Sequence, residues 1–293
     1  MKKVKITVPS ATGSRQRHKV GDFHKQGVVK EILEDAIGIF RALVSTENAF
    51  PKSSARDDLV MTAWVGACER RKVEVECETI CEKLIKQRDS QIRGQLKIAA
   101  RPIVESMYGL SNVPDTKRQI RDKVEHLLER KAFIYKDPEN RKGVFQHPSL
   151  QAIINQTWFK NSKDDGPSHP RQFSQDGKLP LPTIALVYTA IECILDQWVT
   201  GEFSEAPFAA SVYHDKYETH LSNLRAFDKK SVTANIIPQL CEHLLKNARK
   251  NAKVVDIQHE RLAVFNDDDF SAAAEDWKDF GDGAFDNANA QDD

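Results

Sequence analysis

The sequence predicts a mainly α-helical fold: a single multi-helix domain with one small β-hairpin, flanked by disordered charged ends. Apolar residues recur at helical spacing over most of the 293 residues, and the pattern changes to that of strands only around residues 132–146. Charged residues of one sign gather at each end. We therefore expect a disordered basic arm at residues 1–25, a helical domain at residues 26–257 and a mostly disordered acidic aromatic tail at residues 258–293.

A net charge of zero hides the charge difference between the ends. Residues 1–25 contain seven Lys or Arg and one acid, whereas residues 267–293 contain ten Asp or Glu and one base. Such ends usually contact partners rather than build a core. The longest apolar stretch, Ile184–Ile191, is too short to cross a bilayer, and the N-terminus lacks the apolar segment of a secretory signal. Five sparse cysteines are expected to be free thiols, as in an intracellular protein.

The first half of the domain is expected to be helical. The expected helices are residues 29–50, 54–67, 78–108 and 116–128. Pro51 ends the first helix, and Ser54 with Asp57 resembles a capping box for the second. Pro102 is expected to kink the long third helix, because proline removes a backbone donor and clashes with the preceding turn. Thr116 can cap the fourth helix.

The second half of the domain contains the hairpin and the most apolar helix. The expected elements are the hairpin at about 132–146, a helix at 150–158, a long loop at about 160–181 and helices at 184–198, 213–224 and 236–245. A loop of that length is either functional or mobile. The helix Ile184–Trp198 is apolar nearly all round, so we expect it to be central and the most buried element.

Five segments carry a family resemblance. They are Arg93–Val104 leading to Tyr108-Gly109-Leu110, Phe145-Gln146-His147-Pro148, Leu179–Glu192, Trp198-Val199-Thr200-Gly201 and Tyr217–Leu221. Together they cover most of residues 80–225 and resemble an uncharacterised domain family that is abundant in mushroom-forming fungi. The resemblance implies a shared helical fold. It implies no activity, because the family is a domain of unknown function.

Two basic clusters near the N-terminus fit the two-part form of a nuclear import signal. They are Lys2-Lys3 and, after an eleven-residue spacer, Arg15, Arg17 and Lys19. Paired basic clusters suit acidic grooves on an import receptor. The alternative is a solvated basic terminus. With an import signal, the sequence favours the nucleus over the cytoplasm.

The acidic tail contains bulky aromatics spaced among its carboxylates. They are Phe270, Trp277, Phe280 and Phe285. Repulsion between the acids keeps such a segment open and its aromatics exposed, a composition typical of docking segments. The alternative is a solubilising tail, but four aromatics are poorly suited to that role alone. We expect the tail to dock an unknown protein partner.

A basic stripe is expected on the third helix. Arg93, Lys97 and Arg101 are spaced four apart, so they share one helix face and could follow a phosphate backbone. A winged-helix interpretation of residues 116–146 belongs with this nucleic-acid hypothesis. The alternative is a structural role, in which Arg101 reaches Glu105 or a carboxylate of another helix. We favour that role because the body is nearly neutral.

Two carboxylates, Glu192 and Asp196, lie one turn apart on the most apolar helix. Such a pair can hold a divalent metal or share acid and base roles. A buried structural pair with Lys or Arg is the favoured interpretation, because no third ligand is indicated.

Other candidate side chains are expected to be structural. Cys77 and Cys81 could bind zinc only if Cys241 and His243 converged on them, so no metal site is assigned. His147 and His220 are expected to be hydrogen-bonded structural histidines.

No phosphate loop, nucleophile elbow, zinc-protease motif or dinucleotide fingerprint occurs in the sequence, so no catalytic residue and no cofactor is assigned. The sequence therefore predicts a non-catalytic protein-interaction module, nuclear rather than cytoplasmic and without a membrane partner. Nucleic-acid binding through the arm and the Arg93 stripe is the first alternative. An enzyme that uses Glu192 and Asp196 is the second.

Overall fold

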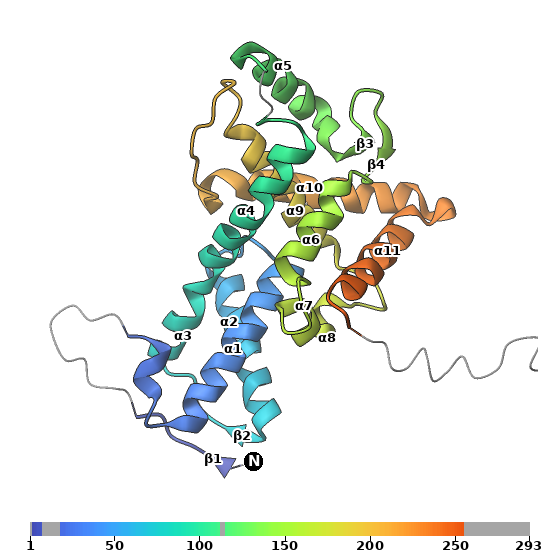
Figure 1. Cartoon of the computed structure of the whole chain (residues 1–293). Coiled ribbons are helices and arrows are strands. Elements are labelled where there is room, and N and C mark those ends of the chain that lie inside the picture. Colours follow the sequence, from blue (N-terminus) through green and yellow to red (C-terminus); the bar gives the residue numbers. More distant parts are fainter. Residues whose placement is uncertain (1, 8–17, 112–114, 255–293) are drawn as a thin grey trace, which may run out of the picture. The chain divides into compact units, whose positions relative to one another are not determined.

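The computed structural model describes residues 2–7, 18–111 and 115–254. The α-helices in these ranges are α1 (Gly27–Thr46), α2 (Ser53–Arg71), α3 (Thr79–Lys86), α4 (Arg88–Met107), α5 (Lys117–Leu128), α6 (Pro148–Trp158), α7 (Asp165–Ser168), α8 (Pro170–Phe173), α9 (Leu181–Asp196), α10 (Ala210–Lys230) and α11 (Ile236–Asn251). The 3-10 helices are η1 (Val20–Phe23), η2 (Glu129–Ile134) and η3 (Val232–Ala234), and the strands are β1 (Lys2–Lys3), β2 (Val73–Glu74), β3 (Tyr135–Asp137) and β4 (Lys142–Val144). The predicted mainly helical fold with a small hairpin is confirmed (Figure 1).

Helix α9 forms the centre of this arrangement. Every residue from Thr183 to Leu195 is buried, and α4, α6 and α10 pack against the helix. An all-round apolar sequence suits a helix that is covered on every side. The expected central helix is therefore confirmed, although it ends at Asp196 rather than at Trp198.

Helices α1 and α2 pack side by side and build a second part of the core with α3. Trp64 of α2 is buried, and its indole Nε1 donates a hydrogen bond to the carbonyl oxygen of Val75 at 2.8 Å. This bond fixes the extended segment that follows α2. Among the described residues, no helix combines the length and the apolar character that a membrane crossing requires.

The expected third helix is two helices. Helix α3 ends at Lys86 and α4 begins at Arg88, so the prediction of one helix over residues 78–108 is wrong. Helix α3 packs on α1 and α2, whereas α4 packs mainly on α6 and α9. Helix α4 then continues through Pro102.

Of the two helix caps expected from sequence, one is present. Thr116 caps α5: its hydroxyl accepts from the backbone nitrogen of Gln119 at 3.3 Å, and its own backbone nitrogen donates to the Gln119 side chain at 2.8 Å. The Ser54–Asp57 capping box is wrong. Helix α2 begins earlier, at Ser53, and no side chain caps its first turn.

The hairpin is present but shorter than expected. Strands β3 and β4 pair antiparallel, with Tyr135 opposite Val144 and Asp137 opposite Lys142. Residues 132–134 belong to η2 instead of a strand. The Asp137 carboxylate closes the turn by accepting two hydrogen bonds from Asn140, one from the backbone at 3.1 Å and one from the side chain at 2.8 Å.

The expected long loop at residues 160–181 contains the short helices α7 and α8, so it is partly helical. The buried Phe173 ring packs against Trp158 and Phe159. Arg41 of α1 also forms an ion pair with Asp165 at 2.7 Å. These long-range contacts order the segment, and local sequence patterns do not reveal them.

The N-terminal arm is partly ordered. Strand β1 pairs with β2 in a parallel sheet that the sequence did not predict, and Phe23 of η1 is fully buried. The prediction of a disordered arm is therefore wrong for residues 2–7 and 18–25. The acidic tail at residues 258–293 lies outside the described residues.

Candidate binding cleft

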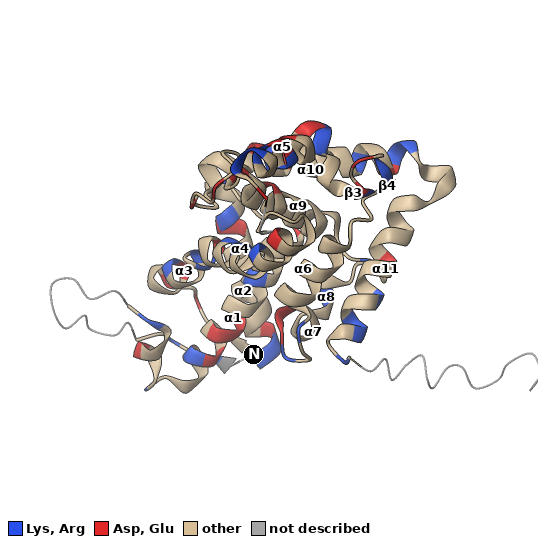
Figure 2. Ribbon diagram, turned by 45° about the horizontal axis from the view of Figure 1, so that its top comes forward, with Lys and Arg blue, Asp and Glu red and all other residues tan. Residues whose placement is uncertain are grey.

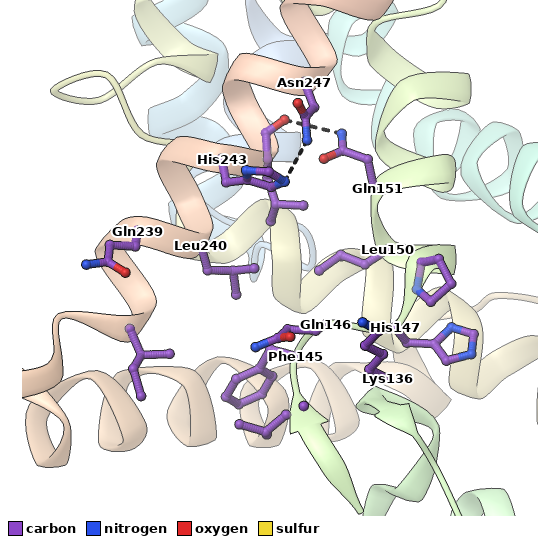
Figure 3. Close-up of a pocket in the computed structure, with 15 residues that line it drawn as sticks. Lys136, Phe145, Gln146, His147, Leu150, Gln151, Gln239, Leu240, His243 and Asn247 are labelled. Atoms are coloured by element: carbon purple, nitrogen blue, oxygen red, sulfur yellow. Dashed lines mark hydrogen bonds between the residues drawn. The ribbon is translucent and has the colours of Figure 1, made fainter.

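A cleft of about 800 Å³ opens between the β3–β4 hairpin, the start of α6 and one face of α11. Figure 3 shows its lining side chains. The apolar members include Val144, Phe145, Leu150, Leu240 and Leu244, and the carboxamide members are Gln146, Gln151, Gln239 and Asn247. None of the 15 lining residues is Asp or Glu. The cleft is therefore apolar with carboxamide and histidine groups and without acidic ones, and Lys136 also lines it.

The hairpin wall of the cleft is held by an unusual backbone at Phe145. Its φ angle is +61°, in the left-handed region that bulky side chains rarely adopt. The Phe145 ring is buried and packs against the rings of Tyr188 and Phe227. This burial offsets the backbone strain and fixes the direction in which the chain enters α6.

His147 connects the hairpin to α6 and has the structural role expected of it. The ring caps the helix, with Nδ1 lying 2.8 Å from the Ser149 hydroxyl oxygen, and stacks on Tyr108 with ring centroids 4.3 Å apart. Burial lowers the pKa of His147 to about 4. A serine within hydrogen-bond distance of a histidine is also the pattern of a catalytic nucleophile. Ser149 is fully buried, so a substrate does not reach it.

Several polar groups of the cleft lie on α6 and α11. Gln151 Nε2 donates to Asn155 Oδ1 at 2.8 Å and to the carbonyl oxygen of Leu244 at 3.2 Å, which joins the two helices. The His243 ring and the Asn247 amide bond to each other at 2.8 Å (Figure 3). The Gln151 Oε1 atom is buried and accepts no hydrogen bond from the described chain. Because that atom is shielded from solvent, the exposed carboxamides of Gln146 and Gln239 are the ones that a ligand can reach.

Glu192, a candidate catalytic residue, lies in a network of ion pairs instead of in the cleft. One carboxylate oxygen accepts from Lys131 Nζ at 2.6 Å and from His220 Nε2 at 2.7 Å, and the other oxygen lies 3.2 Å from Lys216 Nζ. Burial by itself raises the pKa of Glu192, but the bonds from His220 and Lys131 outweigh it and lower the pKa to about 2. Burial also lowers the pKa of His220, against the effect of its bond to Glu192.

Asp196 belongs to the same network. It accepts hydrogen bonds from the Tyr213 hydroxyl at 3.0 Å and from Lys216 Nζ at 2.6 Å. The Lys216 ammonium group thus lies between the carboxylates of Glu192 and Asp196, where a divalent cation that bridged them would lie. The described residues contain no group of three or more His, Cys, Asp and Glu side chains placed to hold a metal ion. The geometry favours a structural role for both carboxylates.

The basic stripe of α4 is bonded to the chain itself. Arg93 Nη1 donates to the carbonyl oxygen of Ala49 at 2.9 Å, and Lys97 Nζ pairs with the Glu205 carboxylate. Arg101 Nη2 lies 2.6 Å from the other oxygen of Glu205. Arg93 and Lys97 are each only 5 % exposed, so a phosphate backbone does not reach them. Figure 2 shows Lys and Arg interspersed with Asp and Glu along the neighbouring α5.

The cysteines do not form a common site. All five are free. Cys77 and Cys81 lie at the start of α3, whereas Cys241 and His243 lie on α11, and the described residues show no metal-binding group among them. Burial raises the pKa of Cys77, Cys81 and Cys241 to about 12. Such thiols are poor nucleophiles and poor metal ligands at neutral pH.

Several candidate residues of the two ends lie outside the described residues. They are Arg15, Arg17, Phe270, Trp277, Phe280 and Phe285. Of the other import-signal residues, Lys2 and Lys3 form β1, and the backbone nitrogen of Lys19 donates to the Asp22 carboxylate at 2.8 Å.

Sequence reasoning missed the cleft as a site. Its residues come from the hairpin and from α11, which are about 100 residues apart along the chain. The turn glycine Gly143, with φ of +70°, and the spacing of Gln239, His243 and Asn247 on one face of α11 are the signals that the sequence contains. Neither signal shows that the two segments lie together.

Comparison with known proteins identifies a family. A family model described as Domain of unknown function (DUF6532) matches residues 35–227, a range that begins within α1 and ends within α10. It includes the hairpin and α6 walls of the cleft but excludes α11. No curated protein and no solved structure matched the chain. The chain therefore belongs to the DUF6532 family, a domain of unknown function.

Proposed function

We propose that this chain is a non-catalytic protein-interaction module, and that its body binds a peptide segment of a partner in the cleft between the hairpin, α6 and α11. The observation that carries this proposal is the lining of the cleft. Apolar side chains and carboxamides lie together there with two histidines and Lys136, without Asp or Glu. The volume of about 800 Å³ lies in the range of roughly 300–1,000 Å³ that is typical of ligand pockets.

The carboxamides suit a peptide backbone. A carboxamide both donates and accepts hydrogen bonds, as does each peptide group, so the two pair in either direction. Gln146 and Gln239 are exposed in the cleft, so their carboxamides can pair with the backbone of the bound segment. Val144 and Leu240, which are both half-buried, offer apolar surface to its side chains. Affinity then comes from apolar burial, and the amides fix the position of the segment.

The two alternatives have less support from the contacts. The enzyme hypothesis needs Glu192 and Asp196 to be available to a substrate, whereas both are bonded to lysines. The nucleic-acid hypothesis needs the stripe of α4 to face solvent, whereas Arg93 and Lys97 are buried.

Three further proposals rest on the sequence and not on the cleft. We propose that the acidic tail docks a protein partner through its aromatics, that the basic clusters direct the chain to the nucleus and that the family is one abundant in mushroom-forming fungi. The charge pattern supports the first two of these, and the resembling segments support the third.

The tail proposal is tested by paired substitutions. Trp277→Ala with Phe280→Ala should weaken partner capture strongly, because apolar anchors carry most interface energy. Asp279→Asn with Asp282→Asn should have a smaller effect that fades at high salt, because exposed charges act mainly on the association rate. The opposite order of effects contradicts docking through the aromatics.

The cleft proposal is tested by selecting peptides from a random library on the full chain and measuring their affinity by fluorescence anisotropy. Leu240→Lys places a charge in the apolar part of the cleft and should weaken binding about tenfold or more, the equivalent of losing one buried aliphatic side chain. Ile98→Lys is the matched control, because Ile98 is 72 % exposed on α4 and does not line the cleft. Selected peptides that bind the Leu240→Lys chain as tightly as the unmodified chain contradict the proposal.

A further inference from the structure

Residues 2–7 lie on the body as a bound peptide lies on a receptor. Lys2 and Lys3 pair with Val73 and Glu74 in a parallel sheet, and the backbone nitrogen of Val4 donates to the carbonyl oxygen of Glu74 at 3.0 Å. These bonds involve the backbone alone. They fix an extended segment without selecting its side chains.

The Gln26 side chain holds the other end of this segment. Its Oε1 atom accepts from the Thr7 backbone nitrogen at 2.8 Å, and its Nε2 atom donates to the Thr7 carbonyl oxygen at 2.5 Å. Gln26 lies just before α1, whose position is fixed by the core. One carboxamide therefore hydrogen-bonds both the backbone N–H and the carbonyl oxygen of Thr7. A receptor holds a peptide backbone in the same way.

The side chains of the segment alternate between the core and solvent. Val4 and Ile6 are partly buried against the core cluster that contains Phe23, whereas Lys3 and Lys5 are exposed. This is the period of two that a strand imposes. Two apolar positions therefore contribute the buried area, and two lysines face outward.

Carboxylates lie opposite the lysines. Glu74, Glu76 and Glu78 line a hollow of about 400 Å³ together with residues 3–6, and Lys3 Nζ lies 3.7 Å from the Glu74 carboxylate. Exposed ion pairs add little affinity, but complementary charge selects the partner and speeds its association. The same surface thus combines a strand edge, an apolar floor and an acidic rim.

We propose that residues 73–78 and Gln26 form a recognition site for extended peptides in which lysines alternate with β-branched apolar residues. Residues 3–6 are its resident occupant. A partner segment with the same alternation binds by displacing them and adding a strand to β2. Displacement also releases Lys2 and Lys3, the first cluster of the expected import signal. This site is separate from the cleft, and the two proposals stand or fall independently.

The test uses the full chain and a labelled peptide with the residue order of positions 2–7, Lys-Lys-Val-Lys-Ile-Thr, blocked at both ends. Val4→Asp with Ile6→Asp removes the apolar contacts of the resident strand and should therefore free the site. By fluorescence anisotropy, this chain should bind the peptide about tenfold more tightly than the unmodified chain, because the competitor in cis is lost. Equal affinity for both chains overturns the proposal.

A second variant guards against damage to the core. Lys3→Glu with Lys5→Glu changes only exposed side chains and repels the resident strand from the acidic rim, so it should also increase peptide binding. Adding Gln26→Ala to either variant should reverse the gain, whereas adding Leu240→Lys in the cleft should not. No gain in either variant overturns the proposal.

A peptide of the same composition without alternation, Lys-Lys-Lys-Val-Ile-Thr, separates recognition from charge attraction. It should bind the Val4→Asp, Ile6→Asp chain at least about fivefold more weakly than the alternating peptide, because its apolar side chains fall on both faces of the strand. Equal binding of the two peptides shows that the acidic rim alone attracts lysines and overturns the proposal.

Discussion

The Glu192 network and the binding cleft differ in how much of their hydrogen-bonding capacity the chain itself uses. Glu192 has three cationic or polar partners within 3.2 Å. In the cleft, the carboxamides of Gln146 and Gln239 are exposed. A site that binds a ligand must keep hydrogen-bonding groups accessible, so the buried charged cluster is suited to stability and the exposed amides of the cleft to recognition.

This difference gives a practical lesson about residue types. Paired carboxylates on an apolar helix are readily interpreted as catalytic groups. An unpaired buried charge is costly, however, so buried carboxylates are usually found in ion pairs. Carboxamides cost less to leave partly unpaired. In this fold the neutral side chains are the better guides to a binding site.

The largest expected effect is on the network. Glu192→Ala leaves Lys131, Lys216 and the buried His220 without their shared acceptor, and removing one partner from a buried pair costs about 3–5 kcal/mol. The free energy of unfolding in urea measures this loss. Glu242→Ala, at an exposed position, is the control and should change stability by less than about 0.5 kcal/mol. A loss below about 1 kcal/mol for Glu192→Ala would show that the network is not structural.

Acid should weaken the same network. The pKa of Glu192 in the folded chain, about 2, lies below its ordinary value of 4.5. A carboxyl group with a lowered folded pKa stabilises the fold fully above its unfolded pKa and loses that contribution as the pH falls through the folded pKa. The stability difference between the unmodified chain and Glu192→Gln should therefore shrink as the pH falls from about 5 to about 2. A difference that stays constant over this range contradicts a charged Glu192.

A medium effect is expected at the hairpin wall of the cleft. Gly143 has a φ of +70°, and a β-carbon added there would meet the Lys136 β-carbon at 2.8 Å. Gly143→Ala should therefore cost about 1–2 kcal/mol from the left-handed backbone alone. It should also weaken peptide binding, because the wall shifts. Gly94→Ala, on α4 with open space around the added carbon, is the control and should not destabilise the chain.

The smallest effect on stability is expected for a change at Gln151, which should distinguish the cleft from the Glu192 network because it affects binding more than stability. Gln151→Met keeps the length of the side chain and removes its unpaired oxygen together with two hydrogen bonds. Each of the two lost bonds is worth about 0.5–1.5 kcal/mol, but the change also removes a buried unpaired oxygen, so the net change in stability should stay below about 1.5 kcal/mol. Binding of a selected peptide should fall about fivefold or more, because Gln151 no longer bonds α6 to α11 and the two walls of the cleft shift. Unchanged peptide binding would show that this bond does not support the cleft.

The sequence predicted the elements with strong local patterns. The all-round apolar α9, the Thr116 cap and the hairpin turn at Asp137–Asn140 are all encoded within a few neighbouring residues. The break at Gln87 and the ordered structure of α7 and α8 depend on contacts with helices that are distant in the sequence. Periodicity does not contain that information.

For the candidate sites, too, the sequence indicates local features but not the distant residues that complete them. The sequence identified Glu192 and Asp196 as buried carboxylates that need partners, but not that Lys131 and Lys216 supply them. The cleft joins a hairpin to a helix about 100 residues further along, and β1 joins the N-terminus to residue 73. Both are products of tertiary packing, so one sequence read alone does not reveal them.

Hydrogen exchange of the full chain, with and without a library-selected peptide, tests the central claim most directly. If the body binds peptides in the cleft, amide exchange should slow in residues 142–151 and 239–247 when the peptide is added, and should stay unchanged around Lys131 and Lys216. Protection around Glu192 and its lysines, with none at the hairpin and α11, would contradict the account.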